Sequence, residues 1–203
     1  MIARLEGVLL EQQPTRIVID VGGVGYAVHV PLSTFTELPD LGASVTLQIY
    51  THAHEGAIQL FGFCSTAERV AFELLLRANR VGPRLAQTIL SGISPAELLE
   101  AIRGENVGAL RAVPGIGTKM AERILLELRD RVDDLAVATG RGAERRPEPS
   151  AEDSAREQTL SALLNLGYPR TEAERVLVDA AEEAGSDATL EVLVRASLKR
   201  LLR

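Results

Sequence analysis

The sequence predicts an α+β protein of three small domains, on three observations. Residues 1–63 carry short apolar and β-branched runs separated by turn residues, whereas from residue 64 the apolar positions recur with helical spacing. One pattern occurs twice within the helical part. A stretch rich in Gly, Pro and charge at 136–154 precedes a last helical segment. We therefore expect a β-barrel at 1–63, an all-α domain at 64–135, a flexible linker at 136–154 and a three-helix domain at 155–203.

The composition is typical of a globular chain with real hydrophobic cores. Of its 203 residues, 46% are hydrophobic and 25% are charged. The longest uncharged run, 21–36, contains three glycines and a proline, so it does not predict a membrane span. The first residues lack the apolar core of a signal peptide. Cys64 is the only cysteine, which excludes an intrachain disulfide and suits a reducing compartment. We expect a cytoplasmic protein without membrane contact.

The first domain is predicted to contain five strands that fit a small barrel. The runs are 2–10, 16–21, 25–30, 45–51 and 58–63. The glycines of the sequence VGGVGY at 21–26 lack the GxGxxG spacing of a nucleotide loop and lead into a strand pattern, so we expect a hairpin turn there. His52 and His54 alternate on one strand face beside Glu55, but a third ligand with recognisable spacing is missing. We interpret them as a solvated strand end and expect neither a metal nor a cofactor.

The middle domain begins with a capping-box pattern. Ser65 and Glu68 predict the start of a helix through residue 79, and Ser94 and Glu97 predict a second that stops at Gly104. Two more helices are expected, near 107–112 and from 118 to about 132.

One pattern is repeated in this domain at an offset of 35 residues. The copies read LLRANRVGPRLAQTIL (75–90) and LRAVPGIGTKMAERIL (110–125). The matched pairs are Leu75/Leu110, Val81/Ile116, Gly82/Gly117, Arg84/Lys119, Ala86/Ala121 and Ile89/Ile124. Agreement of residue type at one offset indicates an internal duplication.

Each copy predicts a helix, a tight turn and a second helix starting near Arg84 or Thr118. We expect Gly82 and Gly117 to supply positive φ and to let a foreign backbone come close. The free N–H groups of a helix start, with the positive end of the helix dipole, receive phosphate oxygens, and Arg84 or Lys119 adds a cation beside them. Such contacts grip a nucleic-acid backbone and read no base sequence.

This pattern resembles the helix-hairpin-helix motif, and two tandem copies resemble a unit that contacts both strands across a minor groove. One copy alone would be explained equally well by an αα-hairpin with Gly at a helix end. Two matched copies favour DNA. The predicted DNA-binding residues are Arg80, Val81, Gly82, Pro83, Arg84, Gly115, Ile116, Gly117, Thr118, Lys119 and Arg123.

The charge distribution supports a local DNA-binding surface. The chain has 22 basic and 28 acidic residues, a net charge of −6. Residues 1–63 hold only two basic side chains against six acids, whereas 77–123 holds seven against four. The cations that could meet phosphate are therefore concentrated in the repeated region.

The last segment is predicted to form three helices with a protein-docking role. The helices are expected at 155–166, ending at Gly167, from a capping box at Thr171 and Glu174 to residue 184, and at 188–202. The module is small and carries no visible chemistry. The sequence LNLGY at 164–168 is similar to the first-loop signature of ubiquitin-associated (UBA-like) three-helix domains. The predicted docking residues are Leu164, Leu166, Gly167 and Tyr168.

Five motifs carry a resemblance over the whole chain apart from the linker. They are MIARLEG at 1–7, VGGVGY at 21–26, LFGF at 60–63, VGPRLA at 81–86 and PGIGTKMAERI at 114–124. Together they resemble the RuvA family, the Holliday-junction-binding subunits of bacterial branch-migration complexes. The resemblance implies an OB-like barrel that forms a homotetramer, a tandem helix-hairpin-helix domain on junction DNA, and a tethered C-terminal domain that docks on the ATPase subunit RuvB. It leaves open an octamer on DNA and a junction resolvase as a further partner.

Two positions depart from the family pattern. The family usually has Gly at the position of Arg80, which we expect to stiffen the first hairpin and to add a cation. The family usually has two adjacent acids in the loop where this chain has Glu55 followed by Gly56. Glu55 is expected at the junction centre, where a carboxylate repels phosphates and disfavours continuous duplex. A solvated acid in a β-turn is the alternative.

Two rival classes are less favoured. The first is a helix-hairpin-helix DNA repair enzyme, a glycosylase or a nuclease. A glycosylase would use an acid such as Asp133 or Asp134, but these lie near the linker, iron–sulfur cysteines are missing, and aromatic residues make up only 3% of the chain. A single-strand binder would stack bases on aromatic residues, of which the acidic barrel has few. The sequence shows no nucleophile–base pair, phosphate loop or metal cluster. ATP hydrolysis is therefore expected from a partner, and this chain is not expected to be an enzyme.

Overall fold

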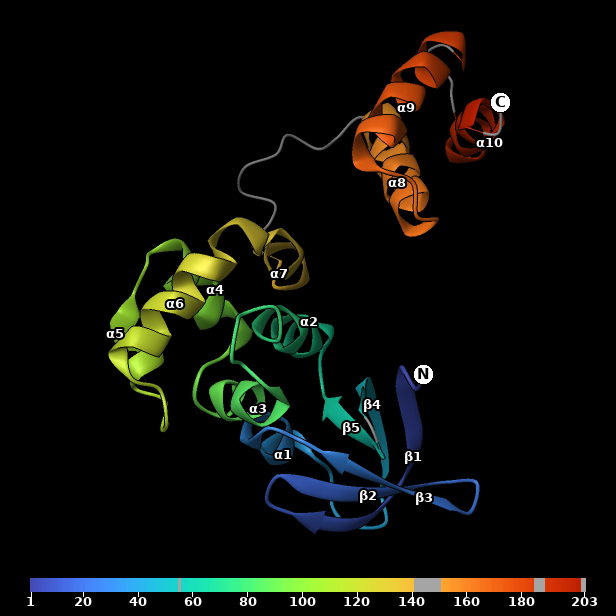
Figure 1. Ribbon diagram of the computed structural model, residues 1–203. Coiled ribbons are helices and arrows are strands. Elements are labelled where there is room, and N and C mark those ends of the chain that lie inside the picture. Colours follow the sequence, from blue (N-terminus) through green and yellow to red (C-terminus); the bar gives the residue numbers. More distant parts are fainter. Residues whose placement is uncertain (55, 141–150, 185–188, 202–203) are drawn as a thin grey trace. The chain divides into compact units, whose positions relative to one another are not determined.

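The computed structural model describes residues 1–54, 56–140, 151–184 and 189–201, and it forms two compact units, Met1–Glu144 and Arg145–Arg203 (Figure 1). The first unit combines a β-barrel with helices, and the second contains three helices. None of the helices in these described ranges is long and apolar enough to cross a membrane. The predicted α+β class with a barrel, a central helical domain and a C-terminal helical domain is confirmed.

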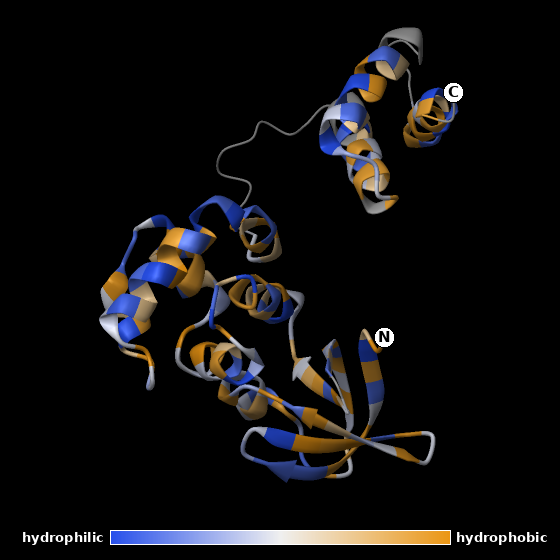
Figure 2. Ribbon diagram, viewed as in Figure 1, coloured by the Kyte–Doolittle hydropathy of each residue, from blue (hydrophilic) through white to orange (hydrophobic). Residues whose placement is uncertain are grey.

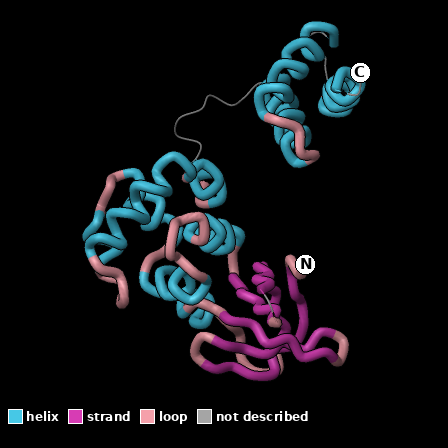
Figure 3. The backbone as a smooth tube through the Cα atoms, viewed as in Figure 1, coloured by secondary structure: helices cyan, strands magenta, loops and turns pink. Residues whose placement is uncertain are grey.

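The barrel consists of five strands in the closed order β1-β2-β3-β5-β4 (Figure 3). They are β1 (Arg4–Gln13), β2 (Arg16–Val21), β3 (Val24–His29), β4 (Ser44–His54) and β5 (Ala57–Phe63). Apolar and polar residues alternate along several strands, so one face of each fills the barrel (Figure 2). A bulge between Leu9 and Glu11 lets β1 pair with both β2 and β4, which closes the OB-like barrel.

The glycine-rich turn between β2 and β3 is a hairpin turn, as predicted. Gly22 and Gly23 have φ of 63° and 91°, the left-handed conformation that glycine adopts without a steric penalty. The carboxylate of Asp20 accepts a hydrogen bond from the Gly23 N–H at 2.7 Å.

A short helix that the sequence did not reveal, α1 (Leu32–Glu37), connects β3 to β4. It has six residues and no side-chain N-cap, so local signals for it are weak. Its stability comes from tertiary contacts, because it packs against α3 and buries Thr34 completely.

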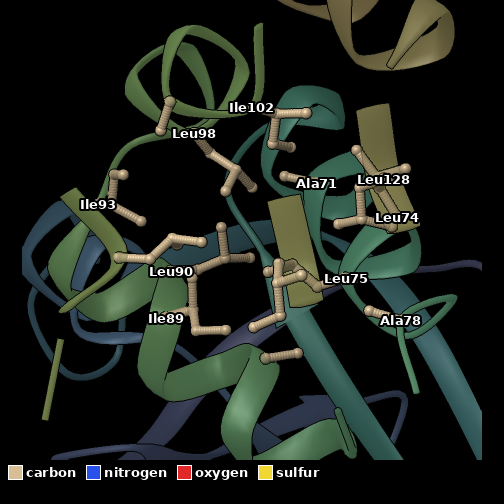
Figure 4. Close-up of a cluster of buried hydrophobic side chains, with 14 of the residues drawn as sticks. Ala71, Leu74, Leu75, Ala78, Ile89, Leu90, Ile93, Leu98, Ile102 and Leu128 are labelled. Carbon is tan, nitrogen blue, oxygen red and sulfur yellow. The ribbon is translucent and has the colours of Figure 1, made fainter. Parts of the chain in front are cut away.

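In the described part of the first unit, seven helical segments follow the barrel. They are α2 (Thr66–Leu75), α3 (Pro83–Gly92), α4 (Pro95–Arg103), α5 (Val107–Arg111), α6 (Thr118–Leu128), the 3₁₀ turn η1 (Arg129–Arg131) and α7 (Asp133–Ala138). Their apolar faces meet in one core, in which Leu75, Ile89, Leu98 and Leu128 are fully buried (Figure 4).

Two predicted boundaries are wrong, the end of one helix and the end of this domain. The helix that begins after Ser65 ends at Leu75 rather than at residue 79, because the chain turns there into the first hairpin. The domain continues past residue 135 to the end of α7, where Leu135 is fully buried and Ala136 nearly so. α7 packs against α2 and α4, so residues 136–138 belong to the folded domain rather than to the linker.

Glu68 fixes the connection between barrel and helices. The predicted capping box is only half formed, because Ser65 accepts from the Glu68 N–H but the Glu68 carboxylate does not return to Ser65. It accepts instead from the hydroxyls of Ser33 at 2.6 Å and Thr34 at 3.0 Å and from the Cys64 N–H at 3.1 Å. Glu68 is 6% exposed, and these three donors satisfy both oxygens of its buried carboxylate.

A second set of hydrogen bonds holds α3 on the barrel. The Gln87 amide, which is buried, donates to the carbonyl of Val30 at 2.7 Å and to that of Thr15 at 3.3 Å. The Leu32 N–H donates to the Ser91 hydroxyl at 2.9 Å. α3 is therefore oriented by the barrel as well as by its helical neighbours.

The second unit is a three-helix domain, as predicted, with shifted helix starts. Its helices are α8 (Ala151–Asn165), α9 (Arg170–Ala184) and α10 (Leu190–Leu201), and each contacts the other two. α8 begins inside the predicted linker. α9 begins at Arg170, so Thr171 is not its N-cap, and Glu174 instead accepts from the Arg170 guanidinium at 2.8 Å. Of the predicted linker, residues 141–150 lie outside the described residues.

Candidate nucleic-acid interface

The two copies of the repeated pattern fold into equivalent hairpins, α2–turn–α3 and α5–turn–α6, and α4 lies between them in the chain. The hydrogen bonds of the turns recur at the same offset of 35: Val81 N–H donates to Ala78 O at 3.1 Å, and Ile116 N–H donates to Val113 O at 3.2 Å. Val81 and Ile116 are 5% and 6% exposed. Their side chains hold the turns against the core, so only their backbone is available to a ligand.

Gly82 and Gly117 are the N-caps of α3 and α6 and have nearly identical geometry. Their angles are φ −90°, ψ 173° and φ −87°, ψ 166°, and neither cap has a side-chain hydrogen bond. A Cβ added at either position would meet no atom within 4 Å. These angles are open to any residue and the adjoining space is empty. Neither backbone conformation nor packing within the unit therefore requires glycine at these positions.

The missing caps leave backbone N–H groups directed away from each helix start. In α6 these groups belong to Thr118 and Lys119, since the next N–H, of Met120, already donates to Gly117 O at 3.1 Å. In α3 they belong to Arg84 and Leu85, because Pro83 has no N–H. With the positive end of the helix dipole behind them, both sites suit an anion, and the approach is open because the preceding residue is glycine.

Positive φ occurs two residues before each N-cap, at Arg80 (68°) and Gly115 (87°). The expectation that Gly82 and Gly117 adopt it was wrong, because the chain reverses where it leaves the first helix and is extended at the cap. A residue with a Cβ in the left-handed region is destabilised by about 1–2 kcal/mol. The first hairpin carries that strain at Arg80, whereas the second has Gly115 at the equivalent position.

Four cations surround the two helix starts: Arg80, Arg84, Lys119 and Arg123. None of them forms an ion pair with a carboxylate in the described part of the chain, whereas Arg69, Arg77 and Arg129 of the same unit do. Arg80 of the first hairpin and the start of α6 line one shallow hollow of ≈ 480 Å³, formed by Arg80, Gly117, Thr118, Lys119, Met120 and Arg123. Of the predicted residues of the first hairpin, Arg80 is thus brought beside the start of α6, whereas Arg84 lines a separate hollow.

Three family models match the chain. They are described as the RuvA N terminal domain (residues 1–62), a SAM-like Helix-hairpin-helix tandem (72–130) and the RuvA C-terminal domain (154–202).

Curated relatives match over the full length. A protein of Syntrophobacter fumaroxidans is 49% identical over 201 residues, which cover 99% of this chain and 100% of the relative. Proteins of Geobacter metallireducens and Pelobacter propionicus are 45% and 46% identical and cover 100% of both chains. Each is named Holliday junction branch migration complex subunit RuvA. The chain belongs to the RuvA family. Its barrel, tandem hairpins and C-terminal helices correspond to the domains of that family.

Glu127 is a residue of this RuvA-family interface that sequence reasoning missed. From α6 its carboxylate accepts hydrogen bonds from the Asn79 N–H at 2.7 Å and from the Asn79 side-chain amide at 3.2 Å. These bonds hold the pKa of Glu127 below its ordinary value. Asn79 precedes Arg80 in the first turn, so Glu127 links the first hairpin to the helix of the second. The two residues are 48 apart in sequence, and no local pattern signals their contact.

Glu127→Ala is expected to weaken junction binding about fivefold, because the first turn loses the two hydrogen bonds that orient it. Glu127→Gln keeps an acceptor and should stay within about twofold of wild type. A fluorescence-anisotropy titration with a labelled four-way junction measures both. Glu122→Ala, on the exposed side of α6, is the matched control for removing one negative charge. Removing this negative charge near the phosphates should tighten binding slightly. If Glu127→Ala also tightened binding, Glu127 would act through its charge alone and not through its hydrogen bonds.

The junction-centre residue Glu55 lies outside the described residues, so its expected role remains a prediction. Next to it, Gly56 has φ 83° in the loop between β4 and β5. His52 and His54 share one face of β4, with ring centroids 5.6 Å apart, as their spacing predicted. Among the described residues there is no group of three or more His, Cys, Asp or Glu side chains that could hold a metal ion.

The predicted docking residues of the second unit differ in exposure. Leu164 and Leu166 are 36% and 62% exposed, whereas Tyr168 is half-buried against the core around Leu163. Gly167 ends α8 at φ 92°, and the N–H groups of Gly167 and Tyr168 donate to the carbonyls of Leu164 and Leu163. Gly167 and Tyr168 therefore shape the loop, while the two leucines offer apolar surface.

Proposed function

We propose that this chain binds four-way (Holliday) DNA junctions through their backbone geometry and without reading base sequence. It is the non-catalytic DNA-binding subunit of a branch-migration complex in which the ATPase subunit RuvB supplies ATP hydrolysis. The names of the relatives, which are 41–49% identical over nearly their full length, support this function.

The observation that carries the proposal is the pair of glycine N-caps. Gly82 and Gly117 share one backbone conformation, and the fold of the unit does not require glycine at either position. Both open onto empty space beside uncapped N–H groups and beside cations that form no ion pair in the described part of the chain. A backbone phosphate fits such a site, because N–H donors and a dipole favour an oxyanion while the missing side chain admits it. Two such sites grip two phosphates, so recognition depends on the spacing of backbones rather than on bases.

The assembly that we propose is a cytoplasmic homotetramer formed through the barrel. Support comes from apolar side chains that the barrel leaves exposed, Leu10, Leu41 and Ile58 among them. Exposed apolar surface of this kind is typical of interfaces. In the tetramer the hairpins would be repeated around a central axis, one set for each arm of the junction.

The test is the salt dependence of junction binding. Lys119→Ala and Arg84→Ala should each flatten the slope of log K against log salt concentration by about 1 for every subunit engaged, because each removes one phosphate contact. Arg195→Ala in the second unit removes the same charge from an exposed i,i+4 pair and should leave the slope unchanged.

The same titrations should include two junctions of unrelated sequence, a linear duplex and a single strand. Equal affinity for the two junctions and weaker binding of the other DNAs are expected. A slope that Lys119→Ala leaves unaltered, or a preference for single strand, would refute the proposal.

A further inference from the structure

A second polar hollow lies next to the first hairpin, on the side of the barrel. It occupies ≈ 340 Å³ between β3, β5 and α3, and Thr15, His29, Gln59, Arg84 and Thr88 are among its lining residues. One of them, Arg84, also stands in the first turn of α3 beside the N-cap Gly82. The hollow therefore continues the first hairpin onto the surface of the barrel.

Two basic side chains, His29 and Arg84, line this hollow, and a third, Arg16, is the neighbour of His29 in the sheet. Arg16 of β2 and His29 of β3 are directly paired in the register of the sheet, and Arg84 belongs to α3. Burial lowers the pKa of His29 from its ordinary 6.5, and the positive charges of Arg16 and Arg84 lower it further. Arg84 lines the same hollow as His29, and Arg16 is paired with His29 across β2 and β3, so both guanidinium groups lie near the imidazole. Neither arginine forms an ion pair within the described ranges, and no carboxylate is among the residues that line the hollow.

Three neutral side chains of the hollow, Gln87, Thr88 and Ser91, already have partners inside the protein. The Gln87 amide donates to the carbonyls of Val30 and Thr15, the Thr88 hydroxyl donates to Arg84 O at 2.9 Å, and the Ser91 hydroxyl donates to Gln87 O at 2.8 Å. The walls are therefore held in place, whereas the cationic charge is uncompensated. Clustered charge of one sign is unfavourable in the free protein and favours an anion at the same place.

We infer that Arg16 and His29 of the barrel, together with Arg84, form a third backbone-phosphate site that grips the DNA strand held by the first hairpin. This inference rests on the proposed function and extends it, because it assigns DNA contacts to the barrel, which is otherwise acidic. It also predicts a proton linkage. A phosphate between the three groups favours the protonated imidazole, so junction binding takes up protons at His29.

Arg16→Gln tests the site directly, since Arg16 is exposed and its loss leaves the barrel core intact. We expect the slope of log K against log salt concentration to flatten by about 1 for each subunit engaged, with an unchanged melting temperature. Arg4→Gln is the matched control, because Arg4 is an exposed arginine of the same barrel that is paired with Glu6 at 2.6 Å. That control should leave the slope as in wild type.

The proton linkage is measured by isothermal titration calorimetry of the full-length chain with a synthetic four-way junction, in buffers of different ionisation enthalpy. The groups that act on His29 are Arg16 and Arg84, a backbone hydrogen bond at Thr15 that raises its pKa, and uncharged Gln59 and Phe61 from β5. Within the described ranges no acid is among these groups. We expect net proton uptake near pH 7 and an affinity that rises as the pH falls toward 6. His29→Gln should abolish that part of the uptake, whereas His52→Gln should retain it.

The outcomes separate this inference from the proposed function. If the wild-type chain bound the junction with a steep salt slope, but Arg16→Gln kept the slope and His29→Gln kept the proton uptake, the third site would be refuted and the hairpin sites would stand. If the wild-type chain showed no preference for the junction, the proposed function itself would fail. If Arg16→Gln flattened the slope of log K against log salt concentration while fold and oligomer were retained, the barrel contact would be established even if His29→Gln were unstable.

Discussion

Gly117→Val is expected to lower the affinity for a four-way junction by about a hundredfold or more. Its side chain would occupy the open space through which a phosphate reaches the N–H groups of Thr118 and Lys119. Loss of two hydrogen bonds to a charged group, at about 1.5–3 kcal/mol each, corresponds to at least that factor.

The fold should tolerate this change. At φ −87° and ψ 166° valine is unstrained, and its Cβ meets no atom within 4 Å. Replacing glycine at an N-cap by an apolar residue weakens the helix start by about 1 kcal/mol or less, which lowers the melting temperature by roughly 2–4 °C. Differential scanning calorimetry and the anisotropy titration, run on the same sample, separate affinity from stability.

Two further variants sharpen the result. Gly82→Val blocks the equivalent site, so the double variant should lose more than either single variant. Gly115→Val is a contrasting control, because φ is 87° there and a β-branched residue strains the turn. It should lower the melting temperature as well as the affinity. If Gly117→Val bound the junction normally, the helix start would not be the phosphate site.

The second large effect is expected from removing the C-terminal unit. A chain of residues 1–140 should bind the junction with nearly wild-type affinity and lose all stimulation of the RuvB ATPase. The hairpins and the barrel lie in the first unit, whereas the exposed Leu164 and Leu166 of the predicted docking site lie in the second. The fluorescence anisotropy of a labelled four-way junction measures DNA binding, and a coupled ATPase assay with RuvB measures the stimulation.

The position of the cut is set by α7. A chain that ends at residue 135 would remove the last turn of that helix and unpack the buried Ala136, so it should be less stable than the chain that ends at residue 140. Residues 145–203 added in excess should compete with the full-length chain for RuvB. If the 1–140 chain still stimulated the ATPase, the docking site would have to lie in the first unit.

The sequence was informative wherever the signal was local. The offset of 35 between Gly82 and Gly117 identified both hairpins, and the Ser94–Glu97 pattern correctly gave a full capping box. Five β runs predicted the barrel, and Gly167 marked the end of α8. Each of these features depends on a few neighbouring residues, so backbone preferences and the spacing of apolar residues are enough to predict it.

Two local patterns predicted the wrong detail. Positive φ is predicted at Gly82 but occurs at Arg80, because the sequence of a turn with two candidate positions does not show at which residue the chain reverses. Glu68 matched a capping box, yet its carboxylate turned to Ser33, Thr34 and the Cys64 N–H. Tertiary hydrogen bonds in a buried site were more favourable there than the local one.

By itself the sequence determined the three-domain order, the duplicated hairpins and the glycines at their helix starts, because these follow from spacing along the chain. Only the tertiary structure decided which distant groups meet at the interface. Glu127 holds Asn79, and His29 of the barrel lines one hollow together with Arg84 of α3. Such contacts arise when the packing of barrel and helices brings together residues that are about fifty or more positions apart, for which single-chain periodicity carries no signal.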